Sequence, residues 1–186
     1  MITLDHVFDI SGGRRAFIEA EEAKELLKPL KEPRNKFTKK CFSNRSFGLP
    51  AAHVAASVLS SVKDQLTEVD LSDIVSRRPE PSFEDKGVRA FGDLLRSQSN
   101  LVELYLMNAG ILLEAAKAVR ELIPSTNKLK ILHFHHNKTG NEGAVAISHL
   151  VKGSPNLEDF RYMHLRRLIL VETCRGVYSS IQSGLM

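Results

Sequence analysis

The chain has 186 residues, 42% of them hydrophobic and 26% charged, and 26 Lys and Arg against 22 Asp and Glu give a net charge of +4. This composition predicts a soluble globular protein, and the length allows one core or one short repeat array. No apolar run of about 18 residues occurs, which excludes a membrane-spanning helix, and the small charge excess does not indicate nucleic-acid binding. Cys41 and Cys174 are too few for a disulfide scaffold and fit a reducing compartment, and the first residues lack the pattern of a signal peptide.

A repeat with a period of 28 to 29 residues organises most of the chain. Its frame is Leu-x-x-Leu-x-Leu-x-x-Asn-x-Leu, and each copy reads as a short strand, a turn with Gly and an amphipathic helix. The copies begin at Phe37, Leu66, Leu101, Leu129 and Leu157. This alternation predicts an α/β fold, a leucine-rich-repeat solenoid of short parallel strands and outer helices.

Three segments are expected along the chain. Residues 1–34 form a cap segment that leads into the array, and residues 35–162 carry the repeats. The apolar residues Val54, Val58 and Val62 mark a helix between the first two strands. The tail, residues 163–186, is apolar and basic without the repeat pattern, so we expect it to diverge from the array.

The repeat is interrupted near residues 75–83. The step from Leu66 to Leu101 is too long for one copy and too short for two. Pro79 and Pro81 exclude a paired central strand there. One strand and helix are therefore expected to be missing from this part of the array.

The later copies repeat the same pattern. Apolar residues at spacings of three and four predict a helix over residues 115–123 and another over 145–151, each followed by a proline, and strands are expected at 104–106 and 132–134. A third strand begins at Leu157.

Several strings of residues resemble the plant Ran GTPase-activating proteins. They are Phe8–Gly13, Cys41–Gly48, Glu68–Asp73, Leu104–Asn108 and Ser154–Phe160. The resemblance implies a crescent that binds the small GTPase Ran in its GTP-bound form and accelerates its GTP hydrolysis in nucleocytoplasmic transport. It implies a regulator with no hydrolytic site and no cofactor of its own, since GTP and magnesium belong to the partner.

The same resemblance sets expectations for the whole molecule. Family members carry an N-terminal domain that targets the nuclear envelope, more repeats and an acidic tail, so this chain is expected to be a shortened, cytoplasmic form. We expect a monomer that neither inserts into membranes nor binds nucleic acid. A non-catalytic repeat module that binds protein through its concave face is the alternative, because a lost repeat would displace the site residues.

The resemblance places two catalytic residues, Asn108 and Arg78. Asn108 would order the catalytic glutamine of the GTPase, and Arg78 would contact Ran and support the charge near the nucleotide. The repeat frame supports the assignment of Asn108. The structural Asn slot of that copy is occupied by Ala109, so Asn108 lies next to the slot and not in it. The alternatives are a turn Asn that caps its own backbone and a solvated loop arginine.

Other candidates are assigned by their place in the repeat. Asn44, Arg45 and Asp73 lie at corresponding strand ends and are assigned to partner binding. Asn137 occupies the Asn slot of its copy and is expected to bond the turn backbone.

Three further groups receive structural interpretations. His133, His135 and His136 are expected to be exposed rim histidines and no metal site, because no carboxylate or cysteine stands at ligand spacing nearby. The basic run Lys36–Lys40 is expected to cover a solvated face, and Cys41 is expected to be a packed thiol.

Overall fold

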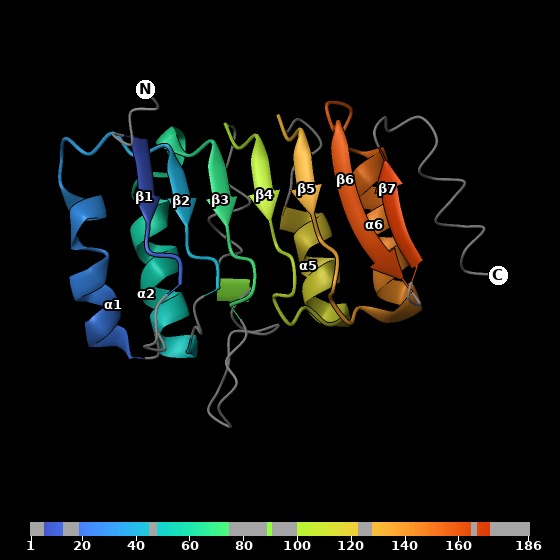
Figure 1. Cartoon of the computed structure of the whole chain (residues 1–186), viewed down its shortest axis with the longest axis horizontal. Coiled ribbons are helices and arrows are strands. Elements are labelled where there is room, and N and C mark those ends of the chain that lie inside the picture. The colour runs from blue at the N-terminus through green and yellow to red at the C-terminus, as the bar shows by residue number, and fades with distance from the viewer. Residues whose placement is uncertain are drawn as a thin grey trace.

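The computed structural model describes residues 6–12, 19–44, 48–74, 89–90, 100–122, 128–164 and 167–171. These residues form one seven-stranded sheet in which the strands follow chain order, with the α-helices packed on one side of it (Figure 1). The strands are β1 Val7–Asp9, β2 Lys39–Cys41, β3 Glu68–Asp70, β4 Glu103–Tyr105, β5 Ile131–His133, β6 Asp159–His164 and β7 Arg167–Val171. The α-helices in this part of the chain are α1 Ala20–Leu26, α2 Leu49–Ser60, α5 Leu113–Leu122 and α6 Gly140–Lys152. Short 3₁₀ helices cover Lys28–Lys31 and Lys63–Gln65.

The first six strands are parallel and share one register. The middle residues of successive strands pair with one another, and each of them is buried against the helices; they are Phe8, Lys40, Val69, Leu104, Leu132 and Phe160. Because side chains alternate along a strand, the flanking residues of each strand lie on the opposite face. We call this second face, which the helices leave uncovered, the open face. The predicted alternation of strands and helices is confirmed, as an α/β sheet of six parallel strands.

The sheet continues across the interruption of the repeat. β3 pairs directly with β4, and Val69 is the partner of Leu104. Equivalent residues of these two strands are 35 positions apart, against 28 for β5 and β6. No other strand lies between them in the sheet. Most of residues 75–99, including Arg77 and Arg78, lies outside the described residues.

The sheet ends in a strand that the repeat frame does not specify. β6 extends to His164, and β7 pairs with it antiparallel, from Phe160 opposite Val171 to His164 opposite Arg167. The sequence did not predict this hairpin, because the repeat frame stops at residue 162 and gives no information about the strand that follows. Residues 172–186 lie outside the described part.

Among the described side chains, the helices bury most of the apolar residues that the spacing predicts. Val58 of α2, Val119 of α5 and Ile147 of α6 are all buried in the core. Val145, which the sequence assigned to the same apolar set, is 43% exposed and therefore does not face the sheet. No helix in the described ranges is long and apolar enough to cross a membrane.

One charged residue lies inside the core. Lys40 occupies a position that Val69, Leu104, Leu132 and Phe160 fill in the later copies, and it is 1% exposed. Its Nζ donates a hydrogen bond to the carbonyl of Phe37 and lies 5.2 Å from the centre of that ring. The prediction that residues 36–40 cover a solvated face is therefore wrong for Lys40. Burial lowers the pKa of Lys40 to about 7, because the ammonium loses its hydration.

This burial makes stability depend on pH. The unfolded chain binds a proton at Lys40 up to the ordinary pKa of 10.5, whereas the folded chain loses it near 7. The free energy of unfolding should therefore rise between about pH 7 and pH 9. We expect Lys40→Met, which keeps an unbranched apolar stem, to raise Tm at pH 7 by about 4 °C, or roughly 1 to 2 kcal/mol. Thermal melts of both proteins across this range test it, and a wild-type Tm no more dependent on pH than that of Lys40→Met would contradict it.

Candidate functional site

A row of left-handed turns follows the carboxyl ends of β1 to β5. The third residue after each strand has a positive φ: Gly12 (66°), Asn44 (54°), Asp73 (54°), Asn108 (47°) and His136 (62°). Side chains rarely adopt this conformation, and Asn and Asp do so most readily because they can bond locally. The left-handed turn conformation therefore largely determines which residue types occur at the third position after each strand. We call these five positions the turn row.

Backbone hydrogen bonds continue the sheet through the turn row. Four of the five N–H groups donate to a carbonyl oxygen of the next turn: Gly12 to Ser43, Asn44 to Ser72 and Asp73 to Met107 at 2.9 Å, and Asn108 to His135 at 3.0 Å. These bonds fix the backbone of the four residues relative to the next turn, so their side chains project from fixed positions. The row is thus a rigid edge of the sheet.

Two of the predicted site residues meet in this row. Nδ2 of Asn108 donates to Oδ1 of Asp73 at 2.7 Å, across a sequence separation of 35 residues. Asn108 is exposed and Asp73 is half-buried. Asn44 is exposed one turn before Asp73, whereas Arg45 and Arg78 lie outside the described residues. The structure therefore brings Asn44, Asp73 and Asn108 into one row.

Asn137 has the structural role that the repeat frame predicts. Its Oδ1 accepts hydrogen bonds from the backbone N–H groups of Ala109 and Ile111, both at 3.1 Å. Its Nδ2 donates to the carbonyls of Leu106 at 2.8 Å and Phe134 at 2.9 Å. This prediction is confirmed. Asn108 differs, because its side chain bonds another side chain instead of the turn backbone.

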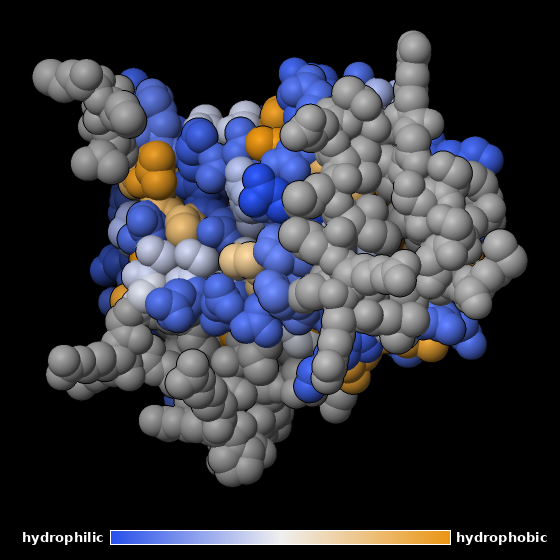
Figure 2. Space-filling view, turned by 45° about the vertical axis from the view of Figure 1, so that its right-hand side comes forward, coloured by the Kyte–Doolittle hydropathy of each residue, from blue (hydrophilic) through white to orange (hydrophobic). Residues whose placement is uncertain are grey.

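Acidic side chains gather on the open face of β1, β3 and β4. They are Asp9, Glu68, Asp70 and Glu103, and Asp73 follows in the turn row. Lys39 forms an ion pair with Glu68 at 2.6 Å, and Tyr105 donates to Glu103 at 2.7 Å. The part of this side that is not covered by grey atoms in Figure 2 is mostly hydrophilic. A face of this kind suits a polar, basic partner surface.

The histidine cluster has a carboxylate beside it, contrary to expectation. Nε2 of His133 lies 2.9 Å from Oδ2 of Asp159 on the neighbouring strand, and Arg161 bonds the same carboxylate at 3.1 Å. Sequence spacing could not show this, because the contact joins two strands. His135 is half-buried, and both burial and the neighbouring cations lower its pKa. Among the described residues, no group of three or more ligands is arranged to hold a metal ion.

Cys41 is half-buried at the end of β2 on the open face and is not packed in the core, so the prediction of a packed thiol is wrong. Its Sγ lies 3.2 Å from Oγ of Ser43 and 3.6 Å from Oδ2 of Asp70. Burial raises the pKa of the thiol, and the carboxylates nearby act in the same direction. The thiol is therefore protonated at neutral pH and is a poor nucleophile.

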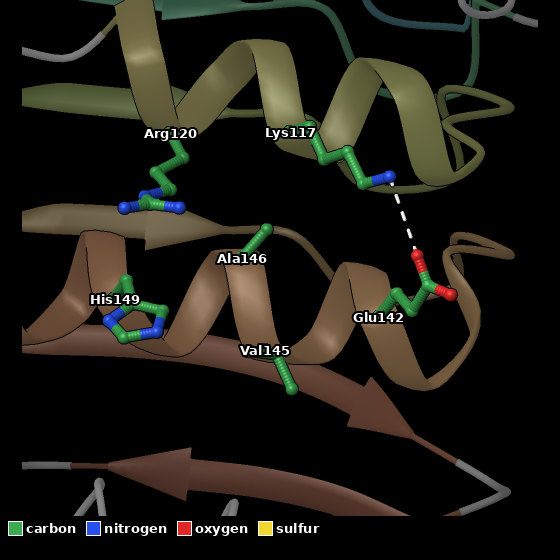
Figure 3. Close-up of a pocket in the computed structure, with 6 residues that line it drawn as sticks. All are labelled: Lys117, Arg120, Glu142, Val145, Ala146 and His149. Atoms are coloured by element: carbon green, nitrogen blue, oxygen red, sulfur yellow. Dashed lines mark ion pairs between the residues drawn. The ribbon is translucent and has the colours of Figure 1, made fainter.

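A separate groove lies on the helix side, between α5 and α6 (Figure 3). Its volume is about 370 Å³, and an ion pair of 3.4 Å between Lys117 and Glu142 crosses it. The lining residues are Lys117, Arg120, Glu142, Val145, Ala146 and His149. None of the predicted site residues is among them.

Two curated relatives from Arabidopsis thaliana are similar to this chain. It is 59% identical to "RAN GTPase-activating protein 2" over 124 residues, which cover 53% of this chain and 23% of the relative. It is 55% identical to "RAN GTPase-activating protein 1" over 129 residues, covering 55% of this chain and 24% of the relative. No family model matches the chain. The chain spans about a quarter of the length of the curated relatives it matches. The resemblance to Ran GTPase-activating proteins is therefore confirmed, over about half of this chain.

Proposed function

We propose that the chain is a GTPase activator for a Ran-type small GTPase in its GTP-bound form. The observation that carries this proposal is the identity of 55% and 59% to two proteins named Ran GTPase-activating proteins. The relatives are about four times longer than the matched part, so the activity proposed here is that of the segment present in this chain.

We also propose that the sheet and helices form a leucine-rich-repeat solenoid. The shared register of six parallel strands, the helices on one side and the turn row support this architecture. In this proposal residues 1–34 are the cap segment, residues 35–162 the repeats with their interruption near 75–83, and residues 163–186 a divergent tail. The open face would then be the concave surface of the array.

The chemistry proposed here is that of a regulator without a hydrolytic site. GTP hydrolysis needs an attacking water held in line and stabilisation of the charge that develops on the phosphates. Asn108 is exposed on a rigid backbone and can contact the catalytic glutamine of the GTPase. Arg78 would support the charge near the nucleotide, while GTP and magnesium remain bound to the partner.

The partner would lie along the turn row and the acidic open face. Asn44 and Arg45 are proposed to belong to this contact, and the acidic residues of β1, β3 and β4 would attract a basic surface. Such an association weakens as salt rises, since exposed charges are screened. The proposed protein is a cytoplasmic monomer that neither inserts into membranes nor binds nucleic acid.

A single-turnover assay of GTP hydrolysis by Ran tests the function. We expect the full chain to accelerate hydrolysis by at least about a hundredfold, because activators of small GTPases act through this step. The control is Ran loaded with a non-hydrolysable GTP analogue, with which binding is measured directly. Binding without acceleration would refute the activator and favour the non-catalytic module.

A further inference from the structure

The carboxylate of Asp73 holds the side-chain amide of Asn108. The hydrogen bond from Nδ2 to Oδ1 is 2.7 Å long and is charge-assisted. Both residues stand on fixed backbone, because their N–H groups bond the carbonyls of Met107 and His135 in the next turns. Both side chains of the pair therefore extend from backbone positions that the fold fixes.

Asp73 has no competing partner in the part of the chain that the structure describes. It forms no ion pair there, and Asn108 is the side chain that its carboxylate bonds. An ionised carboxylate can only accept hydrogen bonds, so it selects the Nδ2 end of the amide. Within the same residues, Oδ1 of Asn108 has no hydrogen-bond partner and lies at the opposite end of the amide group.

We propose that Asp73 is a positioning residue that orients the Asn108 amide and presents its carbonyl oxygen as a hydrogen-bond acceptor. This inference rests on the proposed function, in which Asn108 contacts the catalytic glutamine of the GTPase. The group that Asn108 engages on the partner is then an N–H donor, such as the side-chain amide of a glutamine. The proposal reassigns Asp73, which the sequence placed in direct contact with the partner.

A spectroscopic test does not need Ran. In the ¹⁵N-labelled full chain, the Asn108 side-chain amide is assigned by its disappearance in Asn108→Gly. We expect one of its two Hδ2 protons to be shifted downfield by the bond to Asp73. Asp73→Gly, which keeps the left-handed backbone, should abolish this shift, and Asp73→Asn should retain part of it. An Asn108 amide that is unchanged by Asp73→Gly would overturn the proposal.

A kinetic test separates positioning from partner binding. Asp73→Gly should lower the maximal rate of activated hydrolysis by about tenfold while the half-saturating concentration changes less than about twofold. Added to Asn108→Gly, it should cost nothing further, since its effect passes through Asn108. Asp73→Asn, which also tolerates a positive φ, should stay within about threefold of the wild-type rate.

The outcomes are distinguishable. Additive losses in the double variant, or a loss confined to the half-saturating concentration, would mean that Asp73 contacts the partner directly and would refute the positioning role. If the wild-type chain does not accelerate hydrolysis, the proposed function fails, and the amide spectrum still decides whether Asp73 orients Asn108. Thermal melts within about 3 °C of the wild type show that the variants keep the fold.

Discussion

Asn137→Ala is expected to destabilise the protein by about 4 kcal/mol, because it removes four hydrogen bonds to the backbone at once. The N–H groups of Ala109 and Ile111 and the carbonyls of Leu106 and Phe134 would lose their partner, and Ala109, Leu106 and Phe134 are fully or almost fully buried. A chain of this size should lose about 10 °C in Tm. Urea unfolding followed by circular dichroism gives the free energy directly.

Two variants control this experiment. Asn137→Asp keeps the acceptor for the two N–H groups but loses the two donors, so its stability should lie between those of wild type and Asn137→Ala. Asn108→Gly removes an exposed amide beside the same turn and should change stability by less than about 1 kcal/mol. A loss below about 1 kcal/mol for Asn137→Ala would show that water replaces the missing amide, and the structural role would be wrong.

The strands and the structural Asn could be predicted because both follow from a local rule. Leu132 and Leu104 are both buried at the middle of their strands. Because they are one repeat period apart, the burial of one predicts the burial of the other. Asn137 follows in the same way, since the frame places it at the slot from which its side chain bonds the turn backbone. Features that recur in each copy can therefore be predicted from the repeat period.

What does not repeat could not be predicted. Lys40 occupies an apolar position of the repeat, but the lysines around it made the segment look like a basic surface. The contact between Asp73 and Asn108 spans the interruption, so the period gave no reason to pair them. β1 and β7 lie at the two ends of the sheet, where the frame is weak or absent. Each of these features depends on a neighbour in space that the repeat does not specify.

The turn row shows how one backbone requirement can supply functional groups. A positive φ favours Gly, Asn or Asp, and the fold therefore puts an amide or a carboxylate at the same edge in Asn44, Asp73 and Asn108. Two of the three then bond one another. His136 fills the same place in the following turn, where it lies against His135, with the two ring centres 4.9 Å apart. The chemistry of the edge thus arises from turn geometry before any partner is present.

Asn108→Gly is expected to abolish most of the proposed activation of Ran, by about a hundredfold or more in the single-turnover rate. Glycine removes the amide and keeps the left-handed backbone at φ 47°, so the loss reports the side chain and not a strained turn. Asn108→Ala would add backbone strain at the same position, and any further loss of activation relative to Asn108→Gly measures the effect of that strain. The rate at saturating chain and the half-saturating concentration should be recorded separately, because an amide that acts in the transition state changes the rate more than the binding.

The matched control for Asn108→Gly is Asn44→Gly, at the equivalent place in another turn of the row. Asn44 is exposed with the same backbone conformation and is assigned to partner binding, so its loss should raise the half-saturating concentration and change the rate at saturation by less than about threefold. Equal losses at the two positions would mean that the row binds the partner as a whole and that no single amide acts on the GTPase. An unaffected rate in Asn108→Gly would remove Asn108 from the site and leave Arg78 as the residue to test.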